Sequence, residues 1–181
     1  MSEPNIEIFS GNREPSIAQL ESVCDLFRRN LPVFDDQNVA ENADTLSLRD
    51  TPDAYRKLLE TKTLLLVCGE NERISGLLEW DPRDKQEFLL AYITWFLVDQ
   101  DSRGQGLSTK LHQKFEKQCV PPLIQHTQQT VLQALAVHLK NPALQIYRKW
   151  GYSEKGAPQW NDGRRLFMVK SPEILTRGSS S

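Results

Sequence analysis

Residues 101–108, with the sequence DSRGQGLS, have the composition of a phosphate-binding turn. They separate a run of strand-forming residues, 89–98, from a segment with one apolar stripe formed by Leu107, Leu111 and Phe115. The first N–H groups of a helix are unpaired and carry a partial positive charge, so they bind a phosphate through donors and dipole together. Gly104 and Gly106 lack the Cβ atoms that would hold a phosphate off the backbone, and they permit positive φ. The turn therefore predicts a pyrophosphate bound by main-chain amides.

The turn departs from the two common phosphate-loop patterns. A Walker loop requires Lys directly after the last Gly of GxxxxGK[ST], whereas here Lys110 follows Ser108-Thr109 and the glycines are too close together. A dinucleotide-binding fingerprint requires a third Gly where Thr109 stands, and no repeated strand–helix–strand pattern surrounds the turn. A plain glycine turn between a buried strand and a helix, without a ligand, is the remaining alternative.

Composition and charge restrict the class of protein. The chain has 181 residues, 39% of them hydrophobic, which suits one globular domain with a sizeable core. Its net charge of -2 argues against a general polyanion binder, so we expect no nucleic-acid partner. We find no signal-peptide pattern and no apolar run of membrane-spanning length, and we expect a cytoplasmic protein without a membrane partner. We expect a single domain over residues 1–175 and a flexible tail over residues 176–181.

The cysteines and histidines lack the spacing of a disulfide framework or a metal site. Cys24, Cys68 and Cys119 are an odd, widely spaced set without a CxxC pair, which predicts buried thiols. The three histidines show no paired metal-ligand spacing, so no metal is predicted. His112 lies among the polar positions of the segment after the glycine turn, and we expect it on the surface.

Hydrophobic periodicity predicts a mixture of strands and helices along the chain. Strands are expected near 6–9, at 63–68, 73–80, 89–98 and 131–137, near 152, and at 165–169. Helices are expected at 16–28, at 52–60, from the glycine turn to about 118, and at 142–150. The sequence of residues 69–72 predicts a hairpin turn, and Val120-Pro121-Pro122 predicts a clear break after the third helix.

Residues 137–152 specify both ends of the last helix. Asn141 is a good N-cap, Pro142 suits the first helical position, and Gly151 suits a left-handed C-terminal cap. One face of this helix carries Ala143, Ile146, Tyr147 and Trp150. On periodicity alone, Tyr147 is an ordinary core aromatic.

Together, the two segments resemble the GNAT N-acetyltransferase superfamily of acetyl-CoA-dependent acyltransferases. The first matches the family motif [QR]xxGx[GA] with Arg103 first and Gly106 fourth, while Ser108 stands where Gly or Ala is usual. The second resembles N-x-x-A-x-x-x-Y-x-K-x-G-F and matches at Ala143, Tyr147, Lys149, Gly151 and, conservatively, Tyr152. Lys140 occupies the family's Asn position and Asn141 follows it. The resemblance covers roughly residues 64–169.

The resemblance implies an α+β fold of the three-layer α/β kind. About four helices flank a mixed, mostly antiparallel sheet of six to seven strands. The fourth and fifth strands, here 89–98 and 131–137, splay apart into a V that admits acetyl-CoA. The implied cofactor-binding residues are Phe96, Leu97 and Val98 for the pantetheine arm, Arg103, Gly104, Gln105, Gly106, Leu107 and Ser108 for the pyrophosphate, and Asn141 and Tyr147.

The implied reaction moves an acetyl group from acetyl-CoA to a primary amine by direct transfer in a ternary complex. An amine of pKa about 10.4 loses its proton at pH 7 at a cost of roughly 4 to 5 kcal/mol, whereas a thiol of pKa near 8.5 regains one easily. Tyr147 is the candidate acid for the leaving sulfur, and backbone N–H groups of the fourth strand would stabilise the oxyanion. For the base, Glu79 is the best carboxylate, with a solvated strand-end charge as its alternative. A water chain touching Tyr92 or Glu79 is the other candidate.

The resemblance implies an acceptor amine on a small molecule or on an exposed protein or peptide site. The family's acceptor site uses the first helices and the loop before the last strand, where Trp160 and Asp162 are candidates. The acidic residues within 32–53 either attract a cationic amine or form a solvated loop. We expect a monomer or a homodimer. A catalytically idle acyl-CoA-binding or regulatory module is the alternative function.

Overall fold

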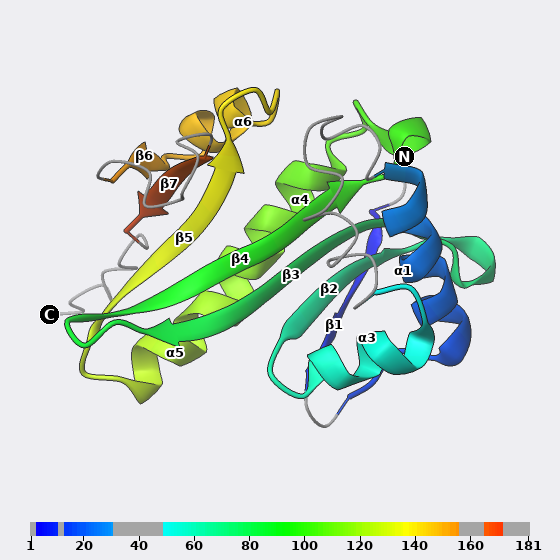
Figure 1. Cartoon of the computed structure of the whole chain (residues 1–181), viewed down its shortest axis with the longest axis horizontal. Coiled ribbons are helices and arrows are strands. Elements are labelled where there is room, and N and C mark those ends of the chain that lie inside the picture. The colour runs from blue at the N-terminus through cyan, green and yellow to red at the C-terminus, as the bar shows by residue number, and fades with distance from the viewer. Residues whose placement is uncertain (1–2, 11–12, 31–48, 156–164, 172–181) are drawn as a thin grey trace, which may run out of the picture.

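The computed structural model describes residues 3–10, 13–30, 49–155 and 165–171 (Figure 1). Within these residues, seven strands form one mixed sheet in the order β1-β2-β3-β4-β5-β7-β6. The pairing of β4 with β5 is parallel, and the other neighbours are antiparallel. The strands are β1 (Asn5–Phe9), β2 (Thr63–Cys68), β3 (Ile74–Asp84), β4 (Phe88–Val98), β5 (Thr130–His138), β6 (Ser153–Glu154) and β7 (Arg165–Lys170).

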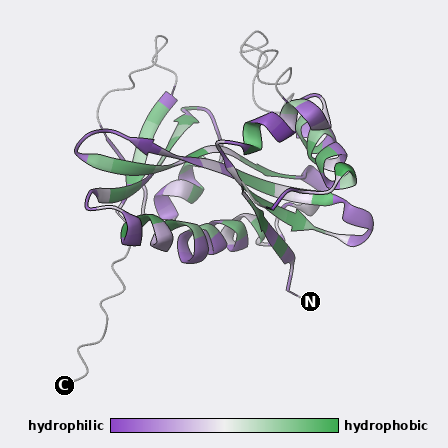
Figure 2. Cartoon of the chain, turned by 90° about the horizontal axis from the view of Figure 1, so that it is seen from below, coloured by the Kyte–Doolittle hydropathy of each residue, from purple (hydrophilic) through white to green (hydrophobic). Residues whose placement is uncertain are grey.

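Helices cover both faces of the sheet, as the three-layer prediction requires (Figures 1 and 2). α1 (Ile17–Asn30) and α3 (Pro52–Leu59) pack on one face, against alternate residues of β2 and β3 such as Leu64 and Leu77. α4 (Leu107–Lys114) and α5 (Val120–His126) pack on the other face, against Leu65 and Leu78. α6 (Leu144–Lys149) follows β5. Because successive side chains of a strand point to opposite faces, the strands contribute side chains to two hydrophobic cores, one on each side of the sheet.

The predicted break at Val120-Pro121-Pro122 is wrong. α4 continues through a π-helical turn, Phe115–Cys119, in which the Val120 N–H donates to the Phe115 carbonyl, and α5 follows directly. The wider turn places both prolines in the first turn of α5. The N–H groups of a first turn have no acceptor within the helix, so the lack of an N–H in proline costs no hydrogen bond there. Burial of Phe115, Cys119 and Val120 holds the segment on the sheet.

The fourth and fifth strands splay apart as predicted. β4 pairs with β5 only from Phe88 with Thr130 to Ile93 with Leu135. The register between β3 and β4 shifts beside Glu79, which leaves Thr94 as an extra residue of β4, a β-bulge. Beyond Ile93, β4 keeps its pairing with β3, while β5 continues along β7. The strands thus form a V whose apex lies at Ile93 and Leu135.

The ends of the predicted elements agree with the structure to within a few residues, except at β3. This strand continues to Asp84, beyond the predicted end at residue 80. The helix predicted at 142–150 begins at Leu144 and ends at Lys149. In the described part of the chain, no helix has the length and apolar character needed to cross a membrane. The single domain over 1–175 stays a prediction, and the tail at 176–181 lies outside the described residues.

Candidate active site

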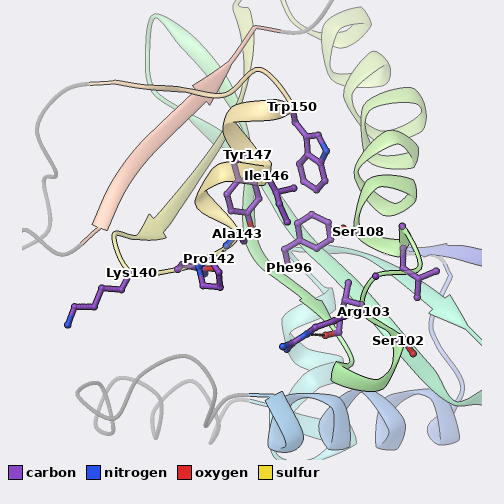
Figure 3. A pocket seen from close by; sticks show the side chains of 15 residues that line it. Phe96, Ser102, Arg103, Ser108, Lys140, Pro142, Ala143, Ile146, Tyr147 and Trp150 are labelled. Carbon is purple, nitrogen blue, oxygen red and sulfur yellow. Dashed lines mark hydrogen bonds between the residues drawn. The ribbon is translucent and has the colours of Figure 1, made fainter.

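A cavity of about 340 Å³ lies at the open end of the V (Figure 3). Three segments line it: the end of β4, the glycine turn with the start of α4, and the segment from Lys140 to Trp150 that contains α6. All the predicted cofactor-binding residues line this cavity except Leu97 and Gln105. The Leu97 side chain points to the opposite face of the sheet, into the core beneath α1 and α3. Only its backbone remains available to the predicted role.

The glycine turn presents an uncapped helix N-terminus to the cavity. Gly104 and Gly106 have φ of 77° and 74°, the left-handed region that favours glycine. Gly106 is the N-cap of α4, and no side chain of the described residues caps this helix start. A Cβ atom added at either glycine would meet no described protein atom within 4 Å. The space beside the first N–H groups of α4 is therefore open to an anion.

Arg103 connects the glycine turn to β4 and α1 through hydrogen bonds. Its Nε donates to the Val98 carbonyl at 3.3 Å, and its Nη2 donates to the Asn30 amide oxygen at 3.2 Å. Asn30 is 1% exposed and donates to the Leu26 carbonyl at 2.8 Å. The first residue of the turn motif thus links the end of β4 to the end of α1.

Both ends of α6 are fixed by local hydrogen bonds. The predicted N-cap at Asn141 and first helical position at Pro142 are wrong, because the N-cap of α6 is Ala143. The Asn141 side-chain oxygen accepts from the Ala143 N–H at 2.8 Å and fixes the turn that precedes the helix. At the other end, Gly151 has φ of 89°, and the Tyr152 N–H donates to the Tyr147 carbonyl at 3.1 Å. With the Gly151 N–H donating to the Arg148 carbonyl at 3.0 Å, this is a Schellman motif, which confirms the predicted glycine cap.

Tyr147 faces the cavity from α6. Its ring lies between Phe96 and Trp150, at centroid distances of 6.5 Å and 5.7 Å. Burial raises the pKa of its hydroxyl, so the group keeps its proton at neutral pH. Among the described residues, no hydrogen-bond partner occupies this hydroxyl, which leaves it able to donate to a group in the cavity.

The expectation that His112 lies on the surface is wrong. The residue is 2% exposed, and its ring stacks on Trp150 at 4.3 Å and 17°. Its Nε2 lies 3.0 Å from the Tyr152 hydroxyl, and its Nδ1 lies 3.4 Å from a Glu116 carboxylate oxygen. The polar neighbours that suggested exposure belong to the adjacent faces of the helix. The histidine itself packs beneath α6.

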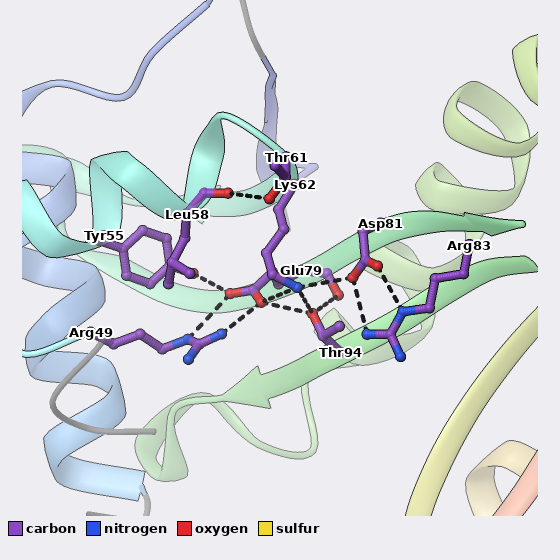
Figure 4. A network of polar contacts seen from close by, with 9 residues as sticks. All are labelled: Arg49, Tyr55, Leu58, Thr61, Lys62, Glu79, Asp81, Arg83 and Thr94. Carbon is purple, nitrogen blue, oxygen red and sulfur yellow. Dashed lines mark hydrogen bonds and ion pairs between the residues drawn. The ribbon is translucent and has the colours of Figure 1, made fainter. Parts of the chain in front are cut away.

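Glu79 is fully buried in the middle of β3, so the alternative of a solvated strand-end charge is wrong. Its carboxylate accepts from Arg49 at 2.8 Å, from the Tyr55 hydroxyl at 2.9 Å and from the Thr94 hydroxyl at 2.7 Å (Figure 4). Lys62 lies 3.3 Å away. Burial alone would raise the pKa of the Glu79 carboxyl, but Arg49, followed by Lys62 and Thr94, holds it below its usual value.

The polar network continues along the same face of β3 and β4. Asp81 pairs with Lys62 at 2.9 Å and with Arg83 at 2.7 Å, and burial is outweighed by these cations, so the pKa of Asp81 is lowered. The Arg83 guanidinium lies 3.6 Å above the Tyr92 ring. Burial raises the pKa of Tyr92. Tyr92 is therefore protonated at neutral pH, and neither it nor Glu79 has the environment of a ready base.

A family model described as "Acetyltransferase (GNAT) domain" matches residues 30–171. The chain belongs to the GNAT acetyltransferase family. It is therefore an acyltransferase, and the GNAT family uses acyl-CoA donors and amine acceptors. A comparison with curated proteins gives no match.

Solved structures of GNAT acetyltransferases share the fold. Ribosomal-protein-S5-alanine acetyltransferase from Vibrio fischeri superposes with a TM-score of 0.66 at 11% identity, over 96% of this chain and 97% of that one. A GNAT acetyltransferase from Staphylococcus aureus gives 0.64 at 15% identity, over 93% and 100%. Aminoglycoside 6'-acetyltransferase type Ii gives 0.60 at 15% identity, over 91% and 96%. At these identities the likeness concerns the fold.

The structure brings to the cavity several side chains that were expected only as core. Ala143, Ile146 and Trp150 line it together with Tyr147, so the apolar face of α6 forms part of the cavity wall as well as a packing surface (Figure 3). Their helical spacing was visible in the sequence, but the splay of β4 and β5 leaves that face open. Lys140 also lines the cavity. Trp160 and Asp162 lie outside the described residues.

Proposed function

We propose that this protein transfers an acetyl group from acetyl-CoA to a primary amine by direct attack within a ternary complex. One observation supports the proposal: the uncapped N-terminus of α4 and the Tyr147 side chain, which bears a hydroxyl group, line the same cavity. The helix N-terminus suits the diphosphate of acetyl-CoA, and the tyrosine hydroxyl suits the thioester at the reactive end of the same molecule.

The chain offers separate groups for each part of the acyl donor. The N–H groups at Gly106, Leu107 and Ser108 would bind the diphosphate, because two positive-φ glycines clear the approach. The edge of β4 beyond Ile93, left by β5, would pair with the amides of the pantetheine arm as an added strand does. The Phe96 and Trp150 rings, whose centroids lie 5.7 Å apart, form one apolar patch of the cavity wall, and this arm would lie against it.

For the leaving sulfur we assign Tyr147 as the proton donor. Its raised pKa keeps the proton in place until a thiolate forms beside it. The amine nitrogen first forms the new C–N bond at the thioester carbon, which turns the carbonyl oxygen into an oxyanion. When the C–S bond then breaks, the sulfur takes the electron pair and then the phenolic proton. Backbone N–H groups of β4 would stabilise the oxyanion that precedes this step.

For the amine proton we propose a water chain that touches Tyr92. Glu79 stays a candidate base, but its contacts weigh against direct proton transfer, since both oxygens already accept hydrogen bonds from Arg49, Tyr55 and Thr94. Accepting a further proton would release a buried guanidinium from its partner.

The acceptor is a primary amine of a small molecule or of an exposed protein or peptide site. The structural neighbours support either class, because one is named for a ribosomal-protein alanine and another for an aminoglycoside. Residues 31–48 and 156–164, where the family's acceptor contacts are expected, lie outside the described part of the chain.

Two measurements test the proposal. Titration calorimetry with coenzyme A should show binding to the folded protein, and thiol release from acetyl-CoA should rise with one member of a panel of peptide and metabolite amines. Tyr147→Phe should bind acetyl-CoA normally but lose roughly one to three decades of turnover, because it removes the proton donor for the leaving sulfur. Full turnover in this variant would remove Tyr147 from the acid role. Binding of coenzyme A without turnover on any amine would favour the idle module instead.

A further inference from the structure

A buried polar cluster lies directly behind the wall of the cavity. Its centre is His112 of α4, 2% exposed, whose ring stacks on Trp150 with a centroid distance of 4.3 Å. Trp150 lines the cavity, whereas His112 does not. The Trp150 side chain therefore separates His112 from any ligand in the cavity.

Hydrogen bonds in this cluster run in one direction and end on a carboxylate. Lys170 and the Gln133 amide N–H both donate to the same Glu116 oxygen, at 2.5 Å and 3.0 Å. The Gln133 carbonyl oxygen then faces Tyr152, so the Tyr152 hydroxyl donates its only proton to Gln133 at 2.9 Å. His112 Nε2, 3.0 Å from the same hydroxyl, must be the donor to Tyr152. The network thus assigns the proton to Nε2 of the imidazole.

His112 contacts two of the three aromatic residues that pack against Tyr147. Trp150 packs against Tyr147 at 5.7 Å and 73°, and Tyr152 packs against it at 6.1 Å and 73°. Tyr152 also closes the Schellman turn through its N–H bond to the Tyr147 carbonyl. We propose that His112 is a positioning residue: its ring face sets Trp150, and its Nε2–H sets Tyr152, so that together they fix the Tyr147 ring. The inference rests on the proposed role of Tyr147.

The electrostatics agree with a neutral positioning group. Burial lowers the pKa of His112 to about 4, with Glu116 opposing the shift and Lys170 adding to it. Glu116 lies in the helical turn that follows α4, and Lys170 lies in β7. The other groups around the imidazole ring, Gln133, Trp150 and Tyr152, are neutral. Since the imidazole stays neutral from pH 6 to 9, replacing it should change rates without changing the shape of the pH–rate profile.

Two substitutions separate the contacts. His112→Phe keeps a ring against Trp150 and removes the donor to Tyr152, whereas His112→Gln keeps an amide N–H near the Nε2 position and removes the stacking. The same changes at His126, exposed at the end of α5, serve as matched controls. Tyr152→Phe deletes only the hydroxyl and provides a milder test if a His112 variant folds poorly. Each protein is assayed for coenzyme A affinity by calorimetry and for kcat and KM for acetyl-CoA from pH 6 to 9.

We expect kcat to fall roughly 10- to 100-fold in His112→Phe with a smaller change in KM, because a small displacement of a reacting group has effects of this size. His112→Gln should mainly raise KM for acetyl-CoA. The double variant of His112→Phe and Tyr152→Phe should be no slower than the slower single variant, because both act through one contact.

The inference is overturned if the His112 variants match wild type in kcat and KM, or if His112→Gln loses the acidic limb of the pH profile, which would make the imidazole an acid–base group. Additive losses in the double variant would also contradict it. A wild-type protein that neither binds coenzyme A nor turns over would refute the proposed function itself, a result distinct from any difference among variants.

Discussion

The buried carboxylate of Glu79 provides the sharpest test of how the sheet is held together. Glu79→Gln preserves shape but removes the charge that faces the Arg49 guanidinium, whose side chain is only 6% exposed (Figure 4). Removing one partner of a buried ion pair costs about 3 to 5 kcal/mol. For a domain of this size, each kcal/mol lowers the melting temperature by about 2–4 °C, so the expected loss is roughly 6–20 °C.

Thermal and urea unfolding followed by circular dichroism at pH 7 would measure this loss. The matched control is Glu154→Gln, which removes an ion pair with Arg148 at 2.6 Å whose side chains are 45% and 42% exposed. Solvent screens that pair, and it should contribute about 0–1 kcal/mol. The two substitutions are chemically identical, so any difference between them reports burial.

The same variant carries a pH signature. The pKa of Glu79 is lower in the folded protein than its usual value of 4.5. A lowered carboxyl pKa contributes stability above the unfolded-state pKa, and this contribution disappears as the pH falls through the folded-state pKa. The stability gap between wild type and Glu79→Gln should therefore be constant near neutrality and close below pH 4.5. A gap no larger than that of the control, or one that persists in acid, would refute the ion-pair reasoning.

Three further outcomes follow from the site. Gly106→Ala places a Cβ at φ of 74°, so it should cost about 1–2 kcal/mol of stability and, in calorimetry, weaken coenzyme A binding by more than this strain explains. Thr94→Val removes the hydroxyl that ties the β4 bulge to Glu79 at 2.7 Å; kcat should fall and Thr94→Ser should restore it, whereas equal rates for both would show that the bulge is held without this bond. Asn141→Ala deletes the side-chain oxygen that accepts from the Ala143 N–H just before α6 and should lower the free energy of unfolding by about 1 kcal/mol, a loss that Asn141→Asp should largely avoid.

Local signals in the sequence predicted the parts of this fold that local chemistry controls. Gly104, Gly106 and Gly151 occupy positive-φ positions because a residue without a Cβ atom adopts them at no steric cost. The apolar runs of β2, β4 and β5 and the helical stripe after Gly106 predict these elements correctly, because a strand buried on both faces is apolar throughout, whereas a helix buried on one face is apolar at helical spacing. The resemblance to the GNAT family predicted the V between β4 and β5, and the pairing confirms it.

Tertiary structure alone decided what covers each face and which charges meet. Glu79 is a buried anchor rather than a strand-end charge because β3 runs on to Asp84 and Arg49, thirty residues away in the chain, reaches its carboxylate. His112 is buried because Tyr152 and Trp150 fold back over α4. Periodicity states that a side chain shares a face with its neighbours, but burial and pKa depend on the segment that packs against that face. That segment comes from elsewhere in the sequence, so only the assembled fold determines it.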